Sequence, residues 1–323
     1  MKVFAGCLSM FILSIPFYAE AGAAEEMKSI IEAVKSNERN YRDLRISIKT
    51  DYRLVNPAIA LDGMLRERNQ AIDCIIKNNQ YYLKEDTTEI PVAGQELIID
   101  TTTISDGKNT RYVQGNVIAN IRYNESKAIH DRYNPFLVLF QSLMVNVPFS
   151  TLLGGDATLK GLPDAGRYSK GVPLKVEYVR DEAVDGEACK LVRLLSYRKA
   201  SDPDIMKVWL SPSHNYLPVK MEGFNPDISA ERPVEVGMVK KWRKVDPGVW
   251  FPAECESTIY LDPPTSPRDL QGFGKYSHTL GSVELHPVVE EGKFSDLPIP
   301  LGTTVIETDG GKILRQYKQG EIQ

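Results

Sequence analysis

The chain has 323 residues, of which 42% are hydrophobic and 25% are charged. This is the composition of an ordinary globular protein, and it excludes a disordered, collagen-like or coiled-coil chain. The length leaves one or two domains open, because a large all-β sheet can run to about 250 residues as one domain. With 39 Lys and Arg against 43 Asp and Glu the net charge is −4, so no basic field exists to hold a nucleic acid.

Residues 1–23 have the pattern of a secretory signal peptide. Lys2 precedes an apolar run over residues 3–18, and the small residues that follow supply cleavage sites after Ala21 and Ala23. The alternative is an uncleaved membrane anchor. The run of about 16 residues, interrupted by Pro16, is shorter than the roughly 20 that span a bilayer. We therefore expect an exported protein whose mature chain, residues 24–323, forms one domain.

Cysteine and histidine usage predicts neither a disulfide scaffold nor a metal site. The mature chain keeps Cys74, Cys189 and Cys255, so at most one internal disulfide can form and one thiol is left over. No Cys-x-x-Cys occurs, and the four histidines are scattered along the sequence. The ligand spacing of a zinc or redox site is therefore missing, and we expect no metal and no cofactor.

The mature chain begins with a predicted amphipathic helix over residues 25–40. Met27, Ile30, Ile31 and Val34 stand at positions i, i+3, i+4 and i+7, with charged residues between them. This spacing places the four apolar side chains on one face of a helix. We expect that face to pack on the core.

The apolar period then changes to two, which is typical of strands. Leu44, Ile46 and Ile48 alternate with polar residues, so one face of the first strand points inward. About ten further strands joined by short polar turns are expected near 70–76, 80–83, 97–104, 110–113, 174–179, 189–195, 206–210, 216–221, 234–245, 249–260 and 276–285, with a terminal hairpin after 302. This order favours one large antiparallel sheet over parallel βαβ units.

One stretch breaks the pattern, because residues 134–153 are apolar on nearly every side. Such hydrophobicity predicts one or two buried helices, and Pro148 argues against a membrane span. Two roles remain open for this stretch. It either fills the concave side of a curved sheet, which burial alone favours, or acts as a lid over a ligand cavity.

Catalytic motifs are missing from the sequence. There is no Gly-x-Ser-x-Gly, Ser-x-x-Lys or His-Glu-x-x-His, and the glycines at 272 and 274 lack the spacing of a phosphate loop. His214 lies in a turn between two predicted strands, where we expect it to be exposed on a hairpin tip. We therefore predict a protein without catalytic residues.

Several phrases in the second half occur in a familiar order: VDGEAC at 184–189, KVWLSP at 207–212, LPVKME at 217–222, VWFPA at 249–253 and PIPLGT at 298–303. In this order the chain resembles the bacterial outer-membrane lipoprotein-sorting proteins, the LolA/LolB/RseB-like superfamily. The resemblance implies an α+β fold that is mainly β, an unclosed antiparallel barrel with helices in its concave face. It also implies a location in the periplasm of a Gram-negative bacterium and an interior that accepts acyl chains.

On this interpretation the protein is a non-enzymatic carrier whose partners are lipid or lipoprotein acyl chains, and we expect it to be a monomer. Six residues, chosen by the apolar pattern rather than by a matched motif, are expected to line or cap the cavity: Phe136, Leu139, Phe140, Leu143, Phe149 and Leu152. Trp209 and Trp250 are expected to be core anchors. The alternative is an envelope-sensor module that binds a protein partner through its sheet. A secreted hydrolase, third, would need histidine and carboxylate groups clustered in one cleft.

Overall fold

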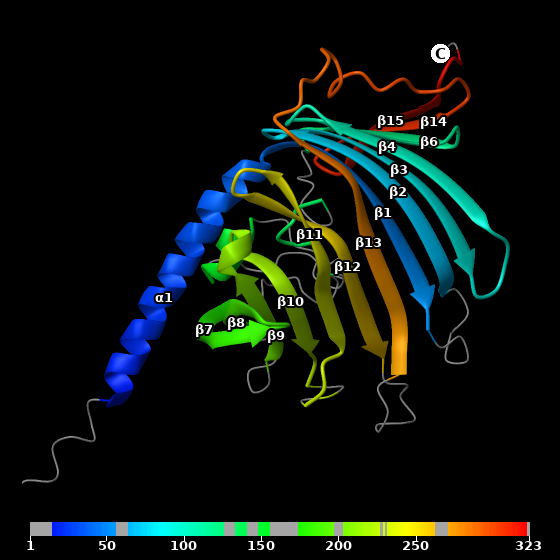
Figure 1. The fold of residues 1–323 in the computed structure, drawn as a ribbon. Helices are drawn as coiled ribbons and strands as arrows, with labels where there is room; N and C mark the ends of the chain where they lie inside the picture. The colour runs from blue at the N-terminus through cyan, green and yellow to red at the C-terminus, as the bar shows by residue number, and fades with distance from the viewer. Residues whose placement is uncertain are drawn as a thin grey trace, which may run out of the picture.

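The computed structural model describes residues 15–55, 64–125, 133–140, 148–155, 174–196, 203–226, 229, 231–261 and 271–321. Their strands form one sheet in the order β15-β14-β6-β5-β4-β3-β2-β1-β13-β12-β11-β10-β9-β8-β7. Figure 1 shows this sheet curving into a trough whose edge strands, β7 and β15, do not meet. The predicted fold class, an unclosed antiparallel barrel, is therefore confirmed.

Within the described residues the helices are α1 (Ile15–Glu38) and α2 (Phe149–Leu153), with short 3-10 helices at Arg39–Tyr41 and Pro212–His214. The strands of the first half are β1 (Asp43–Leu54), β2 (Leu65–Lys77), β3 (Gln80–Pro91), β4 (Leu97–Ser105), β5 (Thr110–Gln114) and β6 (Ile118–Tyr123). Those of the second half are β7 (Leu174–Val184), β8 (Glu187–Ser196), β9 (Asp204–Ser211), β10 (Leu217–Phe224), β11 (Glu235–Asp246), β12 (Val249–Leu261), β13 (Gln271–Leu285), β14 (Thr304–Asp309) and β15 (Lys312–Lys318).

Helix α1 packs the predicted apolar face against the core. Met27, Ile30 and Val34 are buried, and Ile31 packs against the same cluster. The helix begins earlier than predicted, inside the segment assigned to the signal peptide, whose removal stays a prediction. It contacts β7 and α2 and runs beside that end of the sheet. Among the described helices, none has the length and hydropathy needed to cross a membrane.

The inward face of the sheet follows the predicted alternation and is apolar near the turn that joins β2 to β3. Leu44, Ile46 and Ile48 of β1 are buried, and they stand opposite Ile76, Cys74 and Ile72 of β2. Tyr81 and Leu83 of β3 continue these rows. Because side chains of paired residues share one face, the rows form a continuous apolar surface.

Farther along β2 and β3 the inward face becomes polar, whereas β1 continues with the buried Thr50, Tyr52 and Leu54. Gln70 and Arg68 continue the inward positions of β2, and Glu85 and Glu89 stand opposite Ile72 and Arg68 on β3. Arg68 Nε donates to Glu89 Oε1 over 2.8 Å, and Gln70 Nε2 donates to Glu85 Oε1 over 2.9 Å. On β2 and β3 the concave face therefore has an apolar half and a polar half, and the polar half is hydrogen-bonded across the two strands.

Residues 133–140 and helix α2, together called the plug, lie on the concave face. The Leu139 carbonyl accepts a hydrogen bond from Ser257 Oγ of β12 at 3.2 Å. On the neighbouring strand β11 a Cβ added to Gly237 would stand 2.8 Å from that carbonyl oxygen. Glycine at 237 is therefore needed for the plug to approach the sheet this closely.

The prediction of helix over 134–153 is correct only for the short α2 within the described part of that stretch. Residues 133–140 form turns instead, in which Leu137 N donates to Asn134 O and Phe140 N donates to Leu137 O. These bonds span three residues rather than the four of an α-helix. The Asn134 side chain also accepts from Phe136 N at 2.9 Å, and this local bond competes with regular helix.

The three cysteines are buried free thiols. Cys74 and Cys255 belong to the main core, where burial raises the pKa of both thiols above the usual range. Cys189 lies in a second cluster on the outer face with Trp209, and burial raises its pKa to about 11. All three thiols are therefore neutral and poorly nucleophilic at neutral pH.

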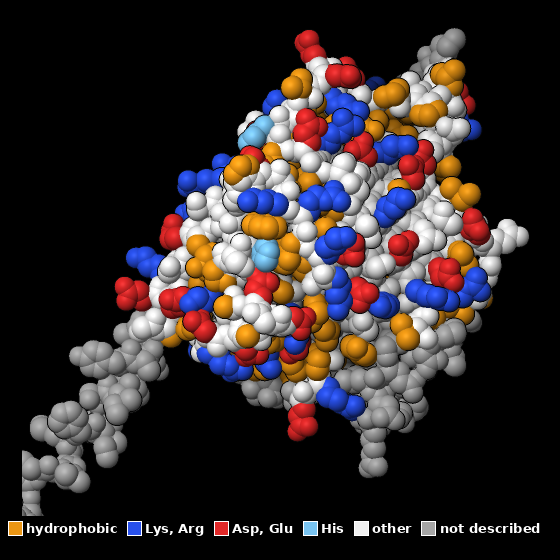
Figure 2. Space-filling model, in the orientation of Figure 1, with side chains coloured by type: hydrophobic (Ala, Val, Ile, Leu, Met, Phe, Trp, Pro, Cys, Tyr) orange, Lys and Arg blue, Asp and Glu red, His pale blue; other side chains and the backbone are white. Residues whose placement is uncertain are grey.

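The outer surface carries mixed charge. Figure 2 shows Lys and Arg side chains interspersed with Asp, Glu and scattered apolar groups on this face of the molecule. On it Lys241 pairs with Glu254 at 3.2 Å, and Lys275 pairs with Glu256 at 3.2 Å. Such exposed pairs contribute little to stability, and on this face they leave no field of a single sign.

Candidate functional site

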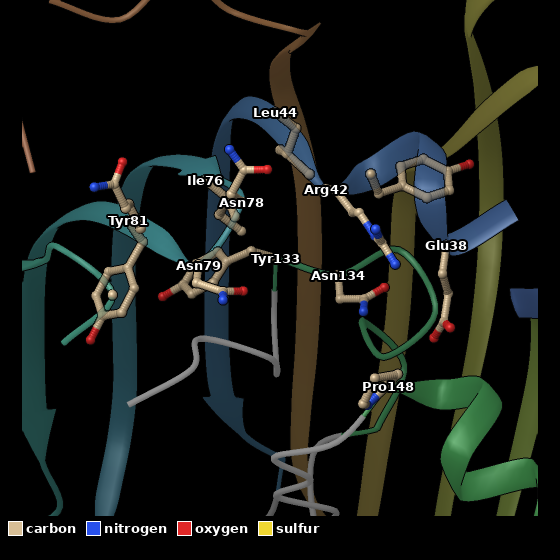
Figure 3. Close-up of a pocket in the computed structure, with 13 residues that line it drawn as sticks. Glu38, Arg42, Leu44, Ile76, Asn78, Asn79, Tyr81, Tyr133, Asn134 and Pro148 are labelled. Carbon is tan, nitrogen blue, oxygen red and sulfur yellow. The ribbon is translucent and has the colours of Figure 1, made fainter. Parts of the chain in front are cut away.

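A cavity of about 720 Å³ opens at one end of the concave face, beside the plug. Figure 3 shows side chains entering it from the start of β1, from the turn between β2 and β3, and from the plug. The lining residues are Glu38, Tyr41, Arg42, Leu44, Ile76, Asn78, Asn79, Gln80, Tyr81, Gly107, Tyr133, Asn134 and Pro148. The cavity therefore forms where turns from distant parts of the sequence converge.

One side of the cavity is apolar and aromatic. Leu44 is the first inward residue of β1, Ile76 is the last of β2 and Tyr81 is the first of β3, so they extend the apolar half of the concave face into the cavity. Tyr133 belongs to the plug, and its hydroxyl donates to Glu85 Oε1 at 3.0 Å. This wall suits an apolar chain lying along the strands.

Tyr41 joins the cavity to the core. Its ring meets Phe136 edge-on at 5.9 Å and Phe251 at 6.2 Å between ring centroids. Its hydroxyl donates to the Trp250 carbonyl over 2.5 Å. Burial raises the pKa of this phenol far above its usual value, so it stays neutral and cannot supply charge to the site.

The opposite side of the cavity is polar. Glu38 at the end of α1 accepts two hydrogen bonds from Ser150 of α2, from its backbone N at 3.2 Å and from its Oγ at 2.5 Å. Arg42, Asn79 and Asn134 also face the cavity (Figure 3). The lining thus places hydrogen-bonding groups next to apolar surface, which is the arrangement that fits an amphiphile.

Five of the six predicted cavity residues are assembled inside the plug. Phe149 stacks on Phe136 at 5.8 Å and lies 5.9 Å from Phe140, and Leu139 and Leu152 are fully buried in the same core. The sixth, Leu143, lies outside the described residues. None of the five lines the 720 Å³ cavity, whose plug residues are Tyr133, Asn134 and Pro148. That the apolar residues line or cap a lipid site stays a prediction.

The cavity residues that sequence analysis missed are mostly turn residues. Asn78 and Asn79 lie in the short polar turn expected between the strands at 70–76 and 80–83, and Arg42 lies between a helix and a strand without any periodic signal. Asn134 had a detectable feature, since Asn before Pro commonly starts a turn. That feature predicts a break in a helix but not a place in a cavity.

The expectation that His214 is exposed on a hairpin tip is wrong. Its side chain is only 15% exposed, because the ring stacks on Trp242 at 4.3 Å and meets Trp250 edge-on at 4.8 Å. His214 Nδ1 lies 2.5 Å from Glu187 Oε1, and Ser211 caps this turn by accepting from His214 N. A short 3-10 turn thus folds the ring back onto the sheet.

This cluster does not have the geometry of a catalytic triad. Both Ser211 Oγ and Glu187 approach Nδ1 of His214, whereas a triad needs serine and carboxylate on opposite ring nitrogens. Partial burial opposes ionisation of Glu187, but the hydrogen bonds from Ser211, Ser213 and His214 outweigh it and hold the pKa of the carboxyl below its usual value. The cluster therefore stabilises a strand connection. Nowhere in the described ranges do three His, Cys, Asp or Glu side chains gather to hold a metal ion.

Comparison with known proteins gives similar structures only. No protein-family model matches the chain, and no curated protein matches it. A DUF1329 family protein from Desulfovibrio piger aligns with TM-score 0.43 and 10% identity, over 83% of this chain and 97% of its own. A putative outer membrane lipoprotein-sorting protein domain from Vibrio parahaemolyticus aligns with TM-score 0.43 and 10% identity, over 84% of this chain and 97% of its own. A LolA superfamily protein from Nitrosomonas europaea aligns with TM-score 0.41 and 13% identity, over 83% of this chain and 97% of its own. These similar structures include members of the superfamily that the sequence phrases resemble.

Proposed function

We propose that this protein is a non-enzymatic periplasmic carrier that binds the acyl chain of a lipid or lipoprotein in the apolar half of its concave face. One observation carries the proposal. An apolar plug lies inside an unclosed sheet, and a cavity of about 720 Å³ continues the same apolar surface beside it. Ligand cavities in proteins typically measure about 300–1,000 Å³, so the space suits a small amphiphile.

The apolar contacts of the plug are of a kind that an acyl chain can replace. Phe136, Phe149 and Leu152 meet the sheet and α1 through apolar surface, which has no directional requirement. Each methylene that leaves water gains about 0.8 kcal/mol, whether it belongs to the protein or to a ligand. A bound chain in the cavity can therefore extend under the plug and compensate for the plug contacts that it displaces.

Native mass spectrometry with organic extraction tests the proposal on mature protein purified from its own envelope fraction. We expect an added mass that matches lipid, released as acyl-containing species.

Leu139→Asp places a carboxylate in the buried plug and should abolish the added mass. Since that variant can also unfold, Ile76→Glu at the half-buried cavity wall is the second test. Val288→Asp, at an almost fully exposed position, is the control that should keep the lipid. A protein without added mass that also takes up no offered lysolipid would contradict the proposal.

A protein-interaction module is the second candidate, and the packing of the plug favours it. Phe136, Leu139 and Phe149 are fully buried, so the core behind the described plug is closely filled. At the edge of the sheet, β15 exposes Ile313 and Leu314, and a free edge is where a partner strand can add. The absence of lipid in the mass spectra, with uptake absent as well, would favour this function.

A further inference from the structure

Among the described residues of the cavity, one cationic side chain, that of Arg42, has no ion-pair partner. The charged lining residues of the cavity, among those described, are Glu38 and Arg42. Glu38 is engaged by the two hydrogen bonds from Ser150. Arg42 is exposed, and within the described chain no carboxylate lies within ion-pair distance of it and no hydrogen bond engages it. Its five N–H donors are therefore available to a ligand.

The neighbouring polar groups also offer donors. Asn134 accepts from Phe136 N through its side-chain oxygen, which leaves the amide NH₂ for the cavity. Asn79 is exposed in the turn between β2 and β3, and Figure 3 shows Arg42, Asn79 and Asn134 around the same space. A guanidinium with two amides matches a group that is rich in acceptor oxygens and negatively charged.

We propose that this cavity binds the anionic head group, phosphate or carboxylate, of a single-chain amphiphile. Arg42 pairs with the head group, and the chain runs along Leu44, Ile76 and Tyr81 into the apolar half of the concave face. This inference rests on the proposed function and specifies the chemistry of the ligand at the same site. A planar guanidinium binds two oxygens of one phosphate or carboxylate at once, so the head group fixes the orientation of the amphiphile.

Calorimetric titration of the mature protein with three probes tests the proposal. Lysophosphatidic acid carries head group and chain, a monoacylglycerol with the same chain lacks the anion, and glycerol 3-phosphate lacks the chain. The test variant is Arg42→Gln. The matched control is Arg45→Gln, since Arg45 lies on the outward face of β1, which begins directly after Arg42, and pairs with Asp73 at 3.7 Å.

We expect lysophosphatidic acid to bind at least tenfold more tightly than the monoacylglycerol, because a charge-assisted bond is lost with the anion. Arg42→Gln should remove this difference and Arg45→Gln should keep it. Equal affinity for the two lipids would overturn the head-group proposal and leave acyl binding intact. Glycerol 3-phosphate binding as tightly as lysophosphatidic acid would assign the site to a free anion instead. Binding of neither lipid would contradict the proposed function itself.

Discussion

The two halves of the concave face differ in chemistry although the same strands build them. On β2, Ile72, Cys74 and Ile76 point into the core, and Arg68 and Gln70 continue the same row of inward positions. The alternation of the strand is unbroken across the change. Alternation therefore predicts which side chains point inward, but not whether those side chains are apolar.

The polar half also explains where an apolar ligand can lie. Its side chains are hydrogen-bonded to one another, as in the ion pair of Arg68 with Glu89 at 2.6 Å and the bonds of Glu85 with Gln70 and Tyr133. Covering such groups with an acyl chain would remove their remaining water without offering a new partner, which costs free energy. The apolar half has no such cost, so we expect the chain to lie there.

The largest loss of stability is expected when a buried ring is removed from the apolar half. Phe136→Ala removes a fully buried ring that packs on Tyr41 and Phe149, and we expect the free energy of unfolding to fall by about 3–5 kcal/mol. Gln70→Ala in the polar half should cost only about 1 kcal/mol, the net contribution of a hydrogen bond. Urea unfolding followed by circular dichroism measures the free energy of unfolding of both variants. Similar losses in the two would contradict the difference described between the apolar and the polar half.

A smaller loss of stability is expected from a substitution where the plug contacts the sheet. Gly237→Ala adds a Cβ 2.8 Å from the Leu139 carbonyl oxygen, and overpacking of this kind costs about 1–3 kcal/mol. Gly223→Ala is the matched control on the neighbouring strand, because its Cβ would meet Glu235 Cβ at an ordinary 3.5 Å. Thermal unfolding compares the two. If both substitutions proved equally mild, the plug would not approach β11 as described.

The smallest loss of stability is expected outside the concave face, at the polar cluster of Glu187 and His214. Like the polar half, this cluster is held by side-chain hydrogen bonds. Glu187→Gln should lower stability by about 1 kcal/mol at pH 7, because the carboxylate accepts from Ser211, Ser213 and His214. The folded state lowers the pKa of Glu187 below 4.5, so its contribution is full above that pH and is lost as the pH falls through the folded pKa. Unfolding curves of the two proteins should converge in acid. A constant difference down to the lowest pH would contradict the assignment.

Sequence patterns predicted the parts of the fold that depend on periodicity. The helix face with Ile30 and Val34 and the strand face with Leu44 and Ile46 are buried as expected, because burial of one face is what the period records. The terminal hairpin is present as β14 and β15, although β14 pairs with β6 in parallel, which no local pattern encodes. Long-range pairing of this kind depends on the whole sheet.

The cavity could not be predicted because many of its residues lie in turns and in the connections between secondary-structure elements. Arg42 becomes a cavity residue only when the start of β1 meets the β2–β3 turn, and this meeting is set by strand curvature and register. The error at His214 has the same origin, since Trp242 covers it from a strand more than twenty positions away in the sequence. Residue type predicted local geometry at both sites, but not the neighbours that folding brings.

The central claim is that an amphiphile lies in the apolar half with its chain beside the plug. Photocrosslinking tests it most directly, with a lysolipid that carries a diazirine in its acyl chain and peptide mapping of the adducts on mature protein. We expect adducts on the inward residues Leu44, Ile76 and Tyr81 and on the described plug residues at 133–140 and in α2, with Arg68 and Gln70 unlabelled. Adducts confined to the outer face, or spread evenly over both halves of the concave face, would contradict it.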